Sequence, residues 1–464
     1  MRPSFGTDGV RGRANAELTP ELVLALGRAA ARRLGPGPML VGRDTRRSGP
    51  MLQAALTAGL ASEGMDVVDL GVLPTPGVAF LSQRRDQPAA MISASHNPFA
   101  DNGVKFFLAG GRKLPVQVEA GLEAELAGIL EDRDRDHDRD RGHPGAARPE
   151  GRGVGGAGPE PGAAEEYTRH LVSTVPAGSG LGGLSVVIDC AHGAASALAA
   201  GVFRQAGAEV LVLSAQPDGC NINDRCGSTF PQRLQAAVVE AGADAGLALD
   251  GDADRVVAVD HLGHLVDGDH LIAICAIDLR DLGRLRDDTV VVTVMANLGF
   301  RLGMRAAGIA VHETPVGDRA VLEALAAGHW SLGGEQSGHV IFSDLATTGD
   351  GMLTGLQLLE VMARRGRPLA ELAASSMTRL PQVLRSVRVA RPSQLEGAAA
   401  LWDAVRDVEA ELAGQGRVLL RASGTEPVVR VMVEAATEEH AARAADRLAD
   451  LVARALGEDP APLA

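Results

Sequence analysis

The sequence predicts an α/β protein with three related α/β domains that hold largely parallel sheets, followed by a smaller C-terminal α+β domain. Over about the first 380 residues, strand-like apolar runs alternate with alanine-rich helical stretches, which favours parallel sheets covered by helices. Each strand is joined to the next helix by a short loop that carries Gly or Asn. After Leu380 the pattern changes to several strands followed by one long helix.

The expected elements follow in chain order. The first domain has a strand at 38–42 and a helix from about 50 to 63. Strands at 185–189 and 289–294 open the second and third domains, and an alanine-rich helix is expected after each. The strands and the helix expected in the last domain lie at 387–389, 416–421, 428–434 and 438–456. This succession divides the chain into domains at 1–163, 164–265, 266–378 and 379–464.

The clearest boundary is the stretch at 131–163. Its first part alternates acidic and basic residues, and a Gly/Pro-rich tract follows it. Because this stretch holds almost nothing to bury, we expect a disordered linker between the first two domains. Its charged part carries six acidic residues against four arginines, so binding of nucleic acid by this tract is not expected.

The composition limits the classes of partner. The formal net charge is −14 and the pI about 5.4, without a basic stripe, so nucleic acid is not expected as a partner. No apolar run approaches the ~20 residues of a membrane span, and the first residues lack the apolar core of a signal peptide. The four cysteines form no C-x-x-C pair. We therefore expect a cytoplasmic protein with reduced thiols and no membrane partner.

The most informative stretch is Asp-Gly-Asp-Ala-Asp-Arg at 250–255, which lies between two apolar runs. Carboxylates at alternate positions at a strand end point toward one side, and they repel one another unless a cation lies among them. Oxygen ligands in that number suit Mg²⁺, which leaves positions for water and a phosphate oxygen. An EF-hand would need Gly and Glu where this chain has Arg255 and His261, and a polar turn is the remaining alternative. The candidate metal ligands are Asp250, Asp252 and Asp254.

A second polar loop, Ser-Ala-Ser-His-Asn-Pro at 93–98, follows a short apolar strand. Ser95 lies where a hydroxyl can project toward a ligand. The chain shows no Ser-His-Asp order of a hydrolase, whereas a phosphorylated serine near Mg²⁺ would complete the metal shell. A Ser/Asn-rich turn without a catalytic role is the alternative, and His96 is expected to form structural hydrogen bonds.

Lysine is rare in this chain. Lysine and arginine together number 45, yet only Lys105 and Lys113 are lysines. Arginine cannot give up its proton near neutral pH, whereas a partly buried lysine can. Lys105 is therefore a candidate for a titratable amine, and Lys113 is the weaker candidate.

Three further loops combine polar residues with glycine. The loop at 5–12 places Arg11 among three glycines, whose N–H groups can approach an anion. The loop at 333–339 offers a carboxylate, a hydroxyl and an imidazole, which suit the hydroxyls or the amine of a sugar. The loop at 421–427, with Arg430 beyond it, combines two arginines, two hydroxyls and a glycine, as a phosphate site requires. Each of these loops has a simple polar turn as its alternative.

Together these motifs resemble those of the α-D-phosphohexomutases, and their order and spacing cover almost the whole chain. The matching motifs lie at 93–98, 250–255, 334–339 and 421–427. Within that family the chain is most similar to the members that act on glucosamine phosphates. The residues that support this are the stretch at 5–12, Gln336 and Arg-Val-Met-Val-Glu at 430–434.

The resemblance implies four domains around a central cleft and a phosphoserine mechanism. Phospho-Ser95 would donate its phosphoryl group to O1 of glucosamine 6-phosphate. The resulting glucosamine 1,6-bisphosphate would reorient and return its 6-phosphate to Ser95, leaving glucosamine 1-phosphate. Such a transfer needs positioning and charge neutralisation above all. A kinase or autophosphorylation would first phosphorylate Ser95, and the subunit could pair as a homodimer.

The resemblance also implies the role of each site residue. One Mg²⁺ per subunit would be held by the phosphoserine at Ser95 and by the three aspartates named above. Lys105 would lie beside the reacting oxygen, while Arg11 and Arg255 would neutralise the phosphoryl group. The residues implied to bind the sugar and its other phosphate are Glu335, Ser337, His339, Arg421, Ser423, Gly424, Thr425 and Arg430.

Some features depart from the family, and other functions stay open. The stretch at 131–163 is longer and more charged than the family's usual link, and 110–114 and 228–230 differ locally. A phosphomannomutase/phosphoglucomutase activity is the main alternative, with Gln336 as the discriminating residue. A non-catalytic sugar-phosphate binding protein would not need Ser95, and a Mg²⁺-dependent phosphatase would need water admitted to the phosphoserine.

Overall fold

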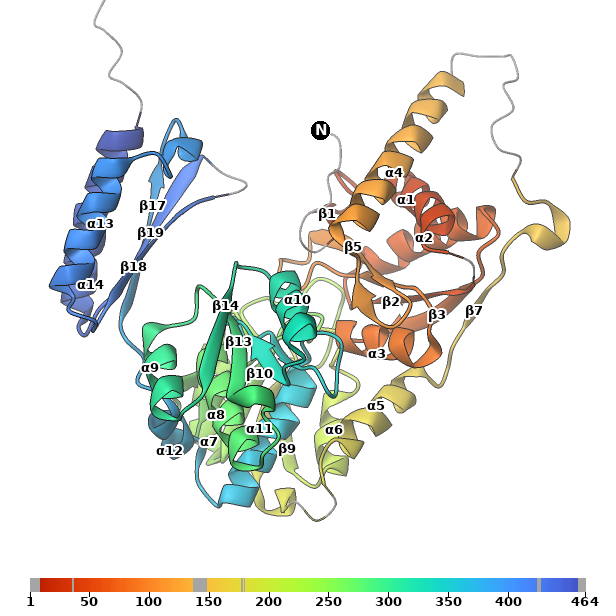
Figure 1. Cartoon of the computed structure of the whole chain (residues 1–464). Coiled ribbons are helices and arrows are strands. Elements are labelled where there is room, and N and C mark those ends of the chain that lie inside the picture. Colours follow the sequence, from red (N-terminus) through yellow and green to blue (C-terminus); the bar gives the residue numbers. More distant parts are fainter. Residues whose placement is uncertain are drawn as a thin grey trace, which may run out of the picture. The chain divides into compact units, whose positions relative to one another are not determined.

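The computed structural model describes residues 9–35, 37–136, 148–176, 178, 180–423 and 427–457 (Figure 1). The chain forms two compact units. The larger consists of residues 1–295 and 309–375, and the smaller of residues 296–308 and 376–464. Among the described residues, none of the helices combines the length and the apolar character that a membrane span requires.

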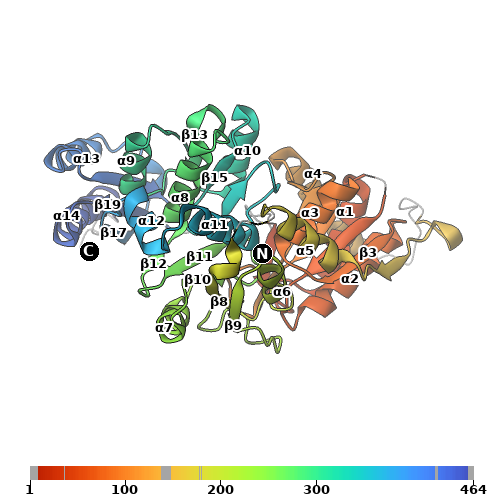
Figure 2. The ribbon, with the colours of Figure 1, turned by 90° about the horizontal axis from the view of Figure 1, so that it is seen from below.

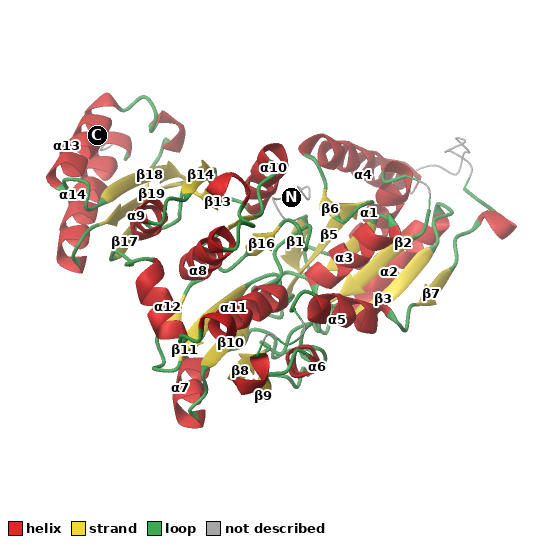
Figure 3. Ribbon diagram, turned by 60° about the horizontal axis from the view of Figure 1, so that its bottom comes forward, coloured by secondary structure: helices red, strands yellow, loops and turns green. Residues whose placement is uncertain are grey.

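The three sheets of the larger unit share one strand order, as expected for related domains. Figure 3 shows their strands in yellow, with helices packed against them. In each, the first, second and third central strands form a parallel core in the spatial order third–first–second, and the fourth pairs antiparallel with the third. These strands are β2 (Met39–Arg43), β3 (Val67–Val72), β4 (Ala89–Ile92) and β5 (Asp101–Leu108); β8 (Ser185–Asp189), β9 (Glu209–Leu213), β10 (Ala245–Leu249) and β11 (Val256–Asp260); and β13 (Thr289–Thr293), β14 (Ala310–Thr314), β15 (Leu332–Gly334) and β16 (Val340–Phe342).

The first sheet carries three additional strands, β1 (Val10–Arg13) and β6 (Arg112–Lys113) on β5 and β7 (Ala157–Pro159) on β3. Helices α1 (Pro20–Arg33), α2 (Gly49–Ser62) and α4 (Val116–Asp136) share one hydrophobic cluster with alternate residues of β2. Helix α3 (Thr75–Arg85) packs on the opposite face, where Val78 lies against Gly42. The first domain is therefore a sheet between two helical layers.

The expectation of a disordered linker at 131–163 is wrong for the described part of that stretch. Helix α4 continues to Asp136, and residues 148–163 contain the short strand β7, which pairs in parallel with β3. The reason is that backbone hydrogen bonds alone can add a strand to a sheet edge, so a Gly-rich segment without apolar side chains can join the sheet. Residues 137–147 lie outside the described residues.

The second and third domains follow the same plan. Strand β12 (Leu265–Val266) extends the second sheet beyond β11. Helix α5 (Ala163–Ser173) enters the second domain and lies beside α3 and α6 (Figure 2). The helices of these two domains are α5, α6 (Ala199–Gln205), α7 (Gln232–Ala241), α8 (Gly268–Asp281), α10 (Asp318–Gly328), α11 (Gly351–Arg365) and α12 (Leu369–Ser376).

The smaller unit is an α+β fold, as predicted. Its antiparallel sheet has the order β17 (Gln382–Arg388), β19 (Val428–Glu434) and β18 (Arg417–Ala422). Helices α13 (Ala399–Glu411) and α14 (Glu438–Leu456) bury their apolar residues on one face of this sheet. Helix α9 (Leu298–Ala306) also belongs to this unit, and Asn297 at its start donates to the Glu434 carboxylate.

Candidate active site

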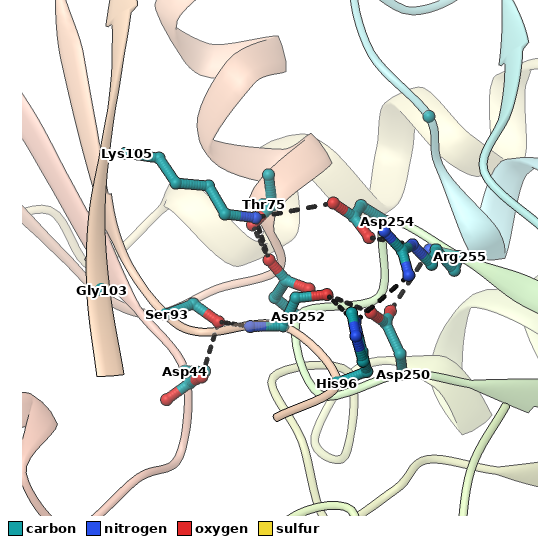
Figure 4. Close-up of polar contacts among 12 residues, drawn as sticks. Asp44, Thr75, Ser93, His96, Gly103, Lys105, Asp250, Asp252, Asp254 and Arg255 are labelled. Carbon is teal, nitrogen blue, oxygen red and sulfur yellow. Dashed lines mark hydrogen bonds and ion pairs between the residues drawn. The ribbon is translucent and has the colours of Figure 1, made fainter. Parts of the chain in front are cut away.

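Two loops predicted to carry chemistry meet in the larger unit (Figure 4). The loop that holds Ser95 joins β4 to β5, and the loop of three aspartates joins β10 to β11. The Ser95 hydroxyl donates a hydrogen bond of 2.6 Å to Asp250 Oδ2, and both residues are buried. The structure therefore brings together the serine and the aspartates that the sequence singled out separately.

Ser95 adopts a left-handed backbone conformation, with φ of 51°, which costs free energy for a residue other than glycine. Its surroundings fix this conformation. The Ser95 N–H donates to Ser93 Oγ at 2.9 Å, and its carbonyl accepts from Asn223 Nδ2 at 2.9 Å. Gly251 packs so closely that a Cβ there would lie 2.6 Å from the Ser95 carbonyl oxygen. The nucleophile candidate is thus locked in place by the second domain.

Arg46 also contacts the loop that holds Ser95, and the sequence analysis did not identify this residue. Its side chain is fully buried and its Nη2 donates to the Ser95 carbonyl at 2.8 Å. Its other donors reach Asp44 and three further loop carbonyls, those of Asn97, Pro98 and Asp101. The polar run at 43–48 could have revealed it, because β2 and β4 are adjacent parallel strands whose carboxyl ends meet at one edge.

The three aspartates can hold a divalent cation. Asp250, Asp252 and Asp254 each offer an oxygen, and these oxygens all lie within 4.8 Å of one another. Asp252 Oδ1 and Asp254 Oδ1 are buried and have no hydrogen-bond partner among the described residues. Buried carboxylate oxygens without partners are rare unless an ion or water satisfies them, and hard oxygen ligands suit Mg²⁺. The donor set therefore fits the expected metal.

The pKa values of this cluster reflect the crowding of negative charge. Burial, with the charges of Asp254 and Asp252, raises the pKa of Asp250 well above its usual range. Burial acts to raise the pKa of Asp254, but the charge of Lys105 together with His339 and Arg255 outweighs it, and the pKa lies well below its usual range. The cluster thus needs positive charge, part of which the protein itself supplies.

Lys105, which the sequence singled out for its amine, contacts two of the aspartates. Its Nζ donates to Asp252 Oδ2 at 2.7 Å and lies 3.6 Å from Asp254 Oδ2. Thr75, at the start of α3, donates to the same Asp252 oxygen at 2.6 Å. Lys105 belongs to the first domain and the aspartates to the second, so the ion pair of Lys105 with Asp252 joins the two domains at the site.

Arg255 and Arg11 lie beside the Ser95 loop. Arg255 Nη1 lies 3.1 Å from His96 Nδ1, and because a guanidinium only donates, the imidazole nitrogen accepts. Burial, followed by the charges of Arg255 and Arg11, lowers the pKa of His96, which keeps the ring neutral. Arg11 lies in β1 opposite Gly103, where a Cβ would come 3.0 Å from its side chain. His96 is therefore a structural hydrogen-bonding residue, as expected.

The predicted sugar loop joins β15 to β16 and lies against the metal loop. Buried His339 has Nδ1 3.8 Å from Asp254 Oδ2 and Nε2 3.6 Å from Asp318 Oδ2. Burial acts to lower the pKa of His339, but the nearby carboxylates of Asp254 and Asp318 raise it overall. Glu335 Oε1 accepts from the Gly317 N–H at 3.2 Å, and Ser337 is exposed. His339 thus lies beneath the loop, while Ser337 faces outward.

The side chain of Gln336, the residue that pointed to amino sugars, contacts another element. Its Nε2 donates to the buried Asp269 carboxylate at 3.2 Å, at the start of α8. The backbone carbonyl of the same residue accepts from the Gly268 N–H at 3.1 Å. This residue therefore anchors the sugar loop to α8, a contact that sequence reasoning did not foresee.

The predicted phosphate loop lies in the smaller unit. Arg421 in β18 and Arg430 in β19 are direct partners across the antiparallel ladder. Like charges directly opposite each other are destabilising, and a bound anion relieves that repulsion. The Ser423 N–H donates to the Val428 carbonyl, which closes the turn, while Gly424 and Thr425 lie outside the described residues.

Four family models match successive parts of the chain. Their descriptions are phosphoglucomutase/phosphomannomutase alpha/beta/alpha domains I, II and III and the C-terminal domain, and they match residues 2–133, 165–263, 267–380 and 384–451. The fold and the facing serine and aspartate loops thus define the class of protein as a phosphohexomutase, an enzyme of the isomerase class that moves a phosphoryl group within its substrate.

Individual relatives narrow this class. A phosphoglucosamine mutase of Symbiobacterium thermophilum is 53% identical over 459 residues, which cover 97% of this chain and 99% of the relative. Another, from Saccharopolyspora erythraea, is 54% identical over 460 residues, covering 98% and 99%. The chain belongs to the phosphoglucosamine mutase family, so the predicted family and enzyme class are confirmed.

Solved structures share the fold. A phosphoglucomutase/phosphomannomutase family protein from Burkholderia thailandensis superposes with a TM-score of 0.79 at 25% identity, covering 97% of each chain. An N-acetylphosphoglucosamine mutase from Aspergillus fumigatus, solved in complex with GlcNAc-6P and magnesium, has a TM-score of 0.65 at 19% identity, covering 97% of this chain and 96% of the other.

Proposed function

We propose that the protein interconverts glucosamine 6-phosphate and glucosamine 1-phosphate through phosphorylated Ser95 and a glucosamine 1,6-bisphosphate intermediate. The observation that carries this proposal is the 2.6 Å contact between the Ser95 hydroxyl and Asp250, within a buried cluster of three aspartates. Phosphoryl transfer depends on positioning and on neutralising the charge of the transferred group. A serine fixed beside a metal-binding cluster meets both requirements.

The reaction consists of two transfers. In the first, the bond between phosphorus and Ser95 Oγ breaks, and a bond from phosphorus to O1 of glucosamine 6-phosphate forms as the O1 hydroxyl loses its proton. In the second, the 6-phosphate of the reoriented bisphosphate moves to Ser95 Oγ, and O6 takes up a proton. We assign this proton exchange to Lys105, whose Nζ lies beside Asp252 in the cluster.

Charge neutralisation is divided among several groups. Mg²⁺, held by the three aspartates and a phosphoserine oxygen, would supply a cationic centre for the transferred group. Arg255, which contacts His96 next to Ser95, and Arg11 on β1 are assigned to the phosphoryl oxygens. Because neutral His96 accepts from Arg255, it orients the guanidinium without adding charge.

Substrate binding is assigned to the two remaining loops. Glu335 and Ser337 would contact the sugar, with His339 supporting the loop from beneath. The phosphate that is not reacting would be held by Arg421, Ser423, Gly424, Thr425 and Arg430. Because the substrate binds in two orientations, this phosphate site must recognise the phosphate rather than the ring. The paired arginines of β18 and β19 suit that task.

The choice of an amino sugar rests on the relatives of the chain. Phosphoglucosamine mutases are 53% identical to it over nearly its whole length. A more distant mutase of the same fold has been solved with GlcNAc-6P and magnesium. The contact of Gln336 with Asp269 supports an indirect role, in which Gln336 shapes the sugar loop.

The phosphoserine tests this proposal most simply. Purified protein is incubated with glucosamine 1,6-bisphosphate and Mg²⁺, and the phosphorylated residue is located by peptide mass spectrometry. We expect the phosphate on Ser95 and the release of glucosamine monophosphates. Ser95→Ala should keep the circular dichroism spectrum and take up no phosphate. Phosphate on another residue in place of Ser95 would contradict the mechanism.

A further inference from the structure

The two lysines of the chain lie on one hairpin of the first domain. Lys105 is in β5 and Lys113 is in β6, which pairs antiparallel with β5. Lys113 lies directly opposite Phe107, two residues beyond Lys105, so both lysines project from the same face of the sheet. Every other basic residue among the 45 is an arginine. The two lysines of the chain are therefore close neighbours on one face of the first sheet.

Lys113 makes its ion pair with the third domain. Its Nζ contacts the carboxylate of Asp318, the first residue of α10, and the two side chains are only 12% and 11% exposed. Asp318 Oδ2 lies 3.6 Å from His339 Nε2, and the neighbouring Gly317 N–H donates to Glu335 at 3.2 Å. Asp318 thus lies beside His339 of the sugar loop, and its neighbour Gly317 donates to Glu335 of the same loop. The ion pair with Lys113 fixes the position of Asp318.

The position of Lys113 is itself fixed by the backbone. The turn before β6 contains Gly111, with φ of 71°, where a Cβ would lie 2.3 Å from the Ala79 carbonyl oxygen. The turn is therefore packed directly on α3. Beside the ion pair, by contrast, a cavity of about 390 Å³ separates β6 from α10 and is lined by Lys113, Leu114, Arg319, Leu322 and Trp330. Lys113 thus lines this cavity while its Nζ contacts Asp318.

We propose that Lys113 is a positioning residue for the sugar-binding loop. By holding Asp318, it fixes Glu335 and His339 relative to the domain that carries Ser95. This inference rests on the proposed function, because it assigns Lys113 to the same reaction. A lysine suits the task, since its compact ammonium can approach a carboxylate closely.

The chain offers a matched control for this ion pair. Glu119 in α4 and Arg319 in α10 form a second ion pair between the same two domains, with side chains 13% and 18% exposed. Arg319 adjoins Asp318 in sequence, but its guanidinium donates to Glu119 and not to a residue of the sugar loop. Loss of the Glu119 contact therefore weakens the junction between the domains without removing the hold on Asp318.

The test compares Lys113→Met, Asp318→Asn, their double variant and Glu119→Gln with wild type, all as the full chain. The kcat and KM for glucosamine 6-phosphate are measured with Mg²⁺ and the bisphosphate primer, together with Tm. Lys113→Met should raise KM and lower kcat/KM about 10- to 100-fold, because the sugar loop is misplaced. The double variant should be no worse than the single ones, since both break the same contact. Lys113→Arg should recover part of the loss, and Glu119→Gln should keep wild-type kinetics.

Two results would overturn the role of Lys113. One is a wild-type kcat/KM in Lys113→Met. The other is an equal loss of kcat/KM in Glu119→Gln, which would show that the Lys113–Asp318 ion pair only holds the two domains together. These results differ from a failure of the proposed function, which shows as a wild-type protein that turns over no glucosamine phosphate and takes up no phosphate on Ser95. If Lys113→Met does not fold, Asp318→Asn and Lys113→Arg decide the question by the same kinetic measures.

Discussion

Arg46 shows how one side chain can determine the geometry of a reactive loop. Its guanidinium donates to the carbonyls of Ser95 and Asn97 at 2.8 Å each, and it is paired with Asp44 at 2.9 Å. Backbone carbonyls that face a buried cation cannot rotate without losing charge-assisted hydrogen bonds. The left-handed conformation of Ser95 is therefore maintained by a residue more than forty positions earlier in the chain.

We expect Arg46→Lys to lower mutase kcat/KM by about 10²-fold, because lysine keeps the charge but cannot reach several carbonyls at once. Uptake of phosphate by Ser95 from the bisphosphate should slow in parallel. Arg47→Lys is the matched control, since Arg47 is the adjacent arginine and is exposed. Equal kinetics in the two variants would show that the loop does not depend on Arg46.

The aspartate cluster gives a prediction about metal binding without turnover. Mg²⁺ should raise the Tm of the wild-type protein by several degrees, because a ligand that binds only the folded state stabilises it. Asp252→Asn should lose most of this shift, since it removes one of three carboxylates. Asp260→Asn, at the far end of the same hairpin, should keep it. An undiminished shift in Asp252→Asn would place the metal elsewhere.

At the scale of residues, the sequence was most informative where chemistry restricts the choice of side chain. Ser95, the three aspartates and Lys105 could be predicted because metal binding and phosphoryl transfer need those groups. Arg46, Thr75 and Asp318 could not, because they act through contacts with residues far away in the chain. Such contacts depend on how distant segments and, for Thr75, separate domains meet, which local patterns do not encode.

At the scale of elements, the three functional loops of the larger unit occupy the same place in their sheets. Each joins the third central strand of its domain to the antiparallel fourth, in the hairpins β4–β5, β10–β11 and β15–β16. Loops at the carboxyl ends of parallel strands are the usual ligand sites of α/β sheets. The shared topology thus places the loops proposed to carry the nucleophile, the metal and the sugar at equivalent positions.

Helix α11 follows the sugar-loop hairpin, and its first turn is capped by the buried carboxylate of Asp350. Asp350 caps the helix by accepting from the Leu353 N–H at 2.9 Å, and Tyr167 of α5 donates to its other oxygen at 2.6 Å. Burial raises the pKa of Asp350 to about 6 despite these hydrogen bonds. Folding thus favours the protonated form of Asp350 relative to the unfolded chain.

This raised pKa predicts a pH dependence of stability. The contribution of Asp350 is fully present below its unfolded pKa of about 4 and is lost as pH rises through about 6, because the charged form is penalised by burial. Asp350→Asn keeps an acceptor for the cap and cannot ionise. The Tm of Asp350→Asn relative to wild type should therefore increase between pH 4 and 6.5 and then level off. A difference that is constant over this range would contradict the assignment.

Strand β7 is an element that the hydrophobic pattern of the sequence does not predict. Long helices and buried strands could be predicted because they show a hydrophobic period, and the helix expected at 438–456 coincides with α14. Strand β7 has three exposed residues, Ala157–Pro159, and joins β3 through its backbone alone. A segment of this kind has no side-chain signature, so composition favoured disorder.

At the scale of the whole molecule, an acidic chain with a net charge of −14 is proposed to bind an anionic substrate. The negative net charge and an anionic substrate are compatible, because a few cations near a site affect binding more than the net charge of the chain does. Lys105, Arg255 and Arg11 surround the serine loop, and Arg421 faces Arg430 in the smaller unit. Positive charge is thus concentrated where the phosphates are expected.

The measurement that tests the central claim most directly is a Mg²⁺-dependent mutase assay, primed with the matching bisphosphate. It compares kcat/KM for glucosamine 6-phosphate, glucose 6-phosphate and mannose 6-phosphate, with Ser95→Ala as the control. We predict a large preference for glucosamine 6-phosphate and no turnover by Ser95→Ala. A preference for either neutral sugar would contradict the proposed substrate, and wild-type turnover by Ser95→Ala would contradict the phosphoserine mechanism.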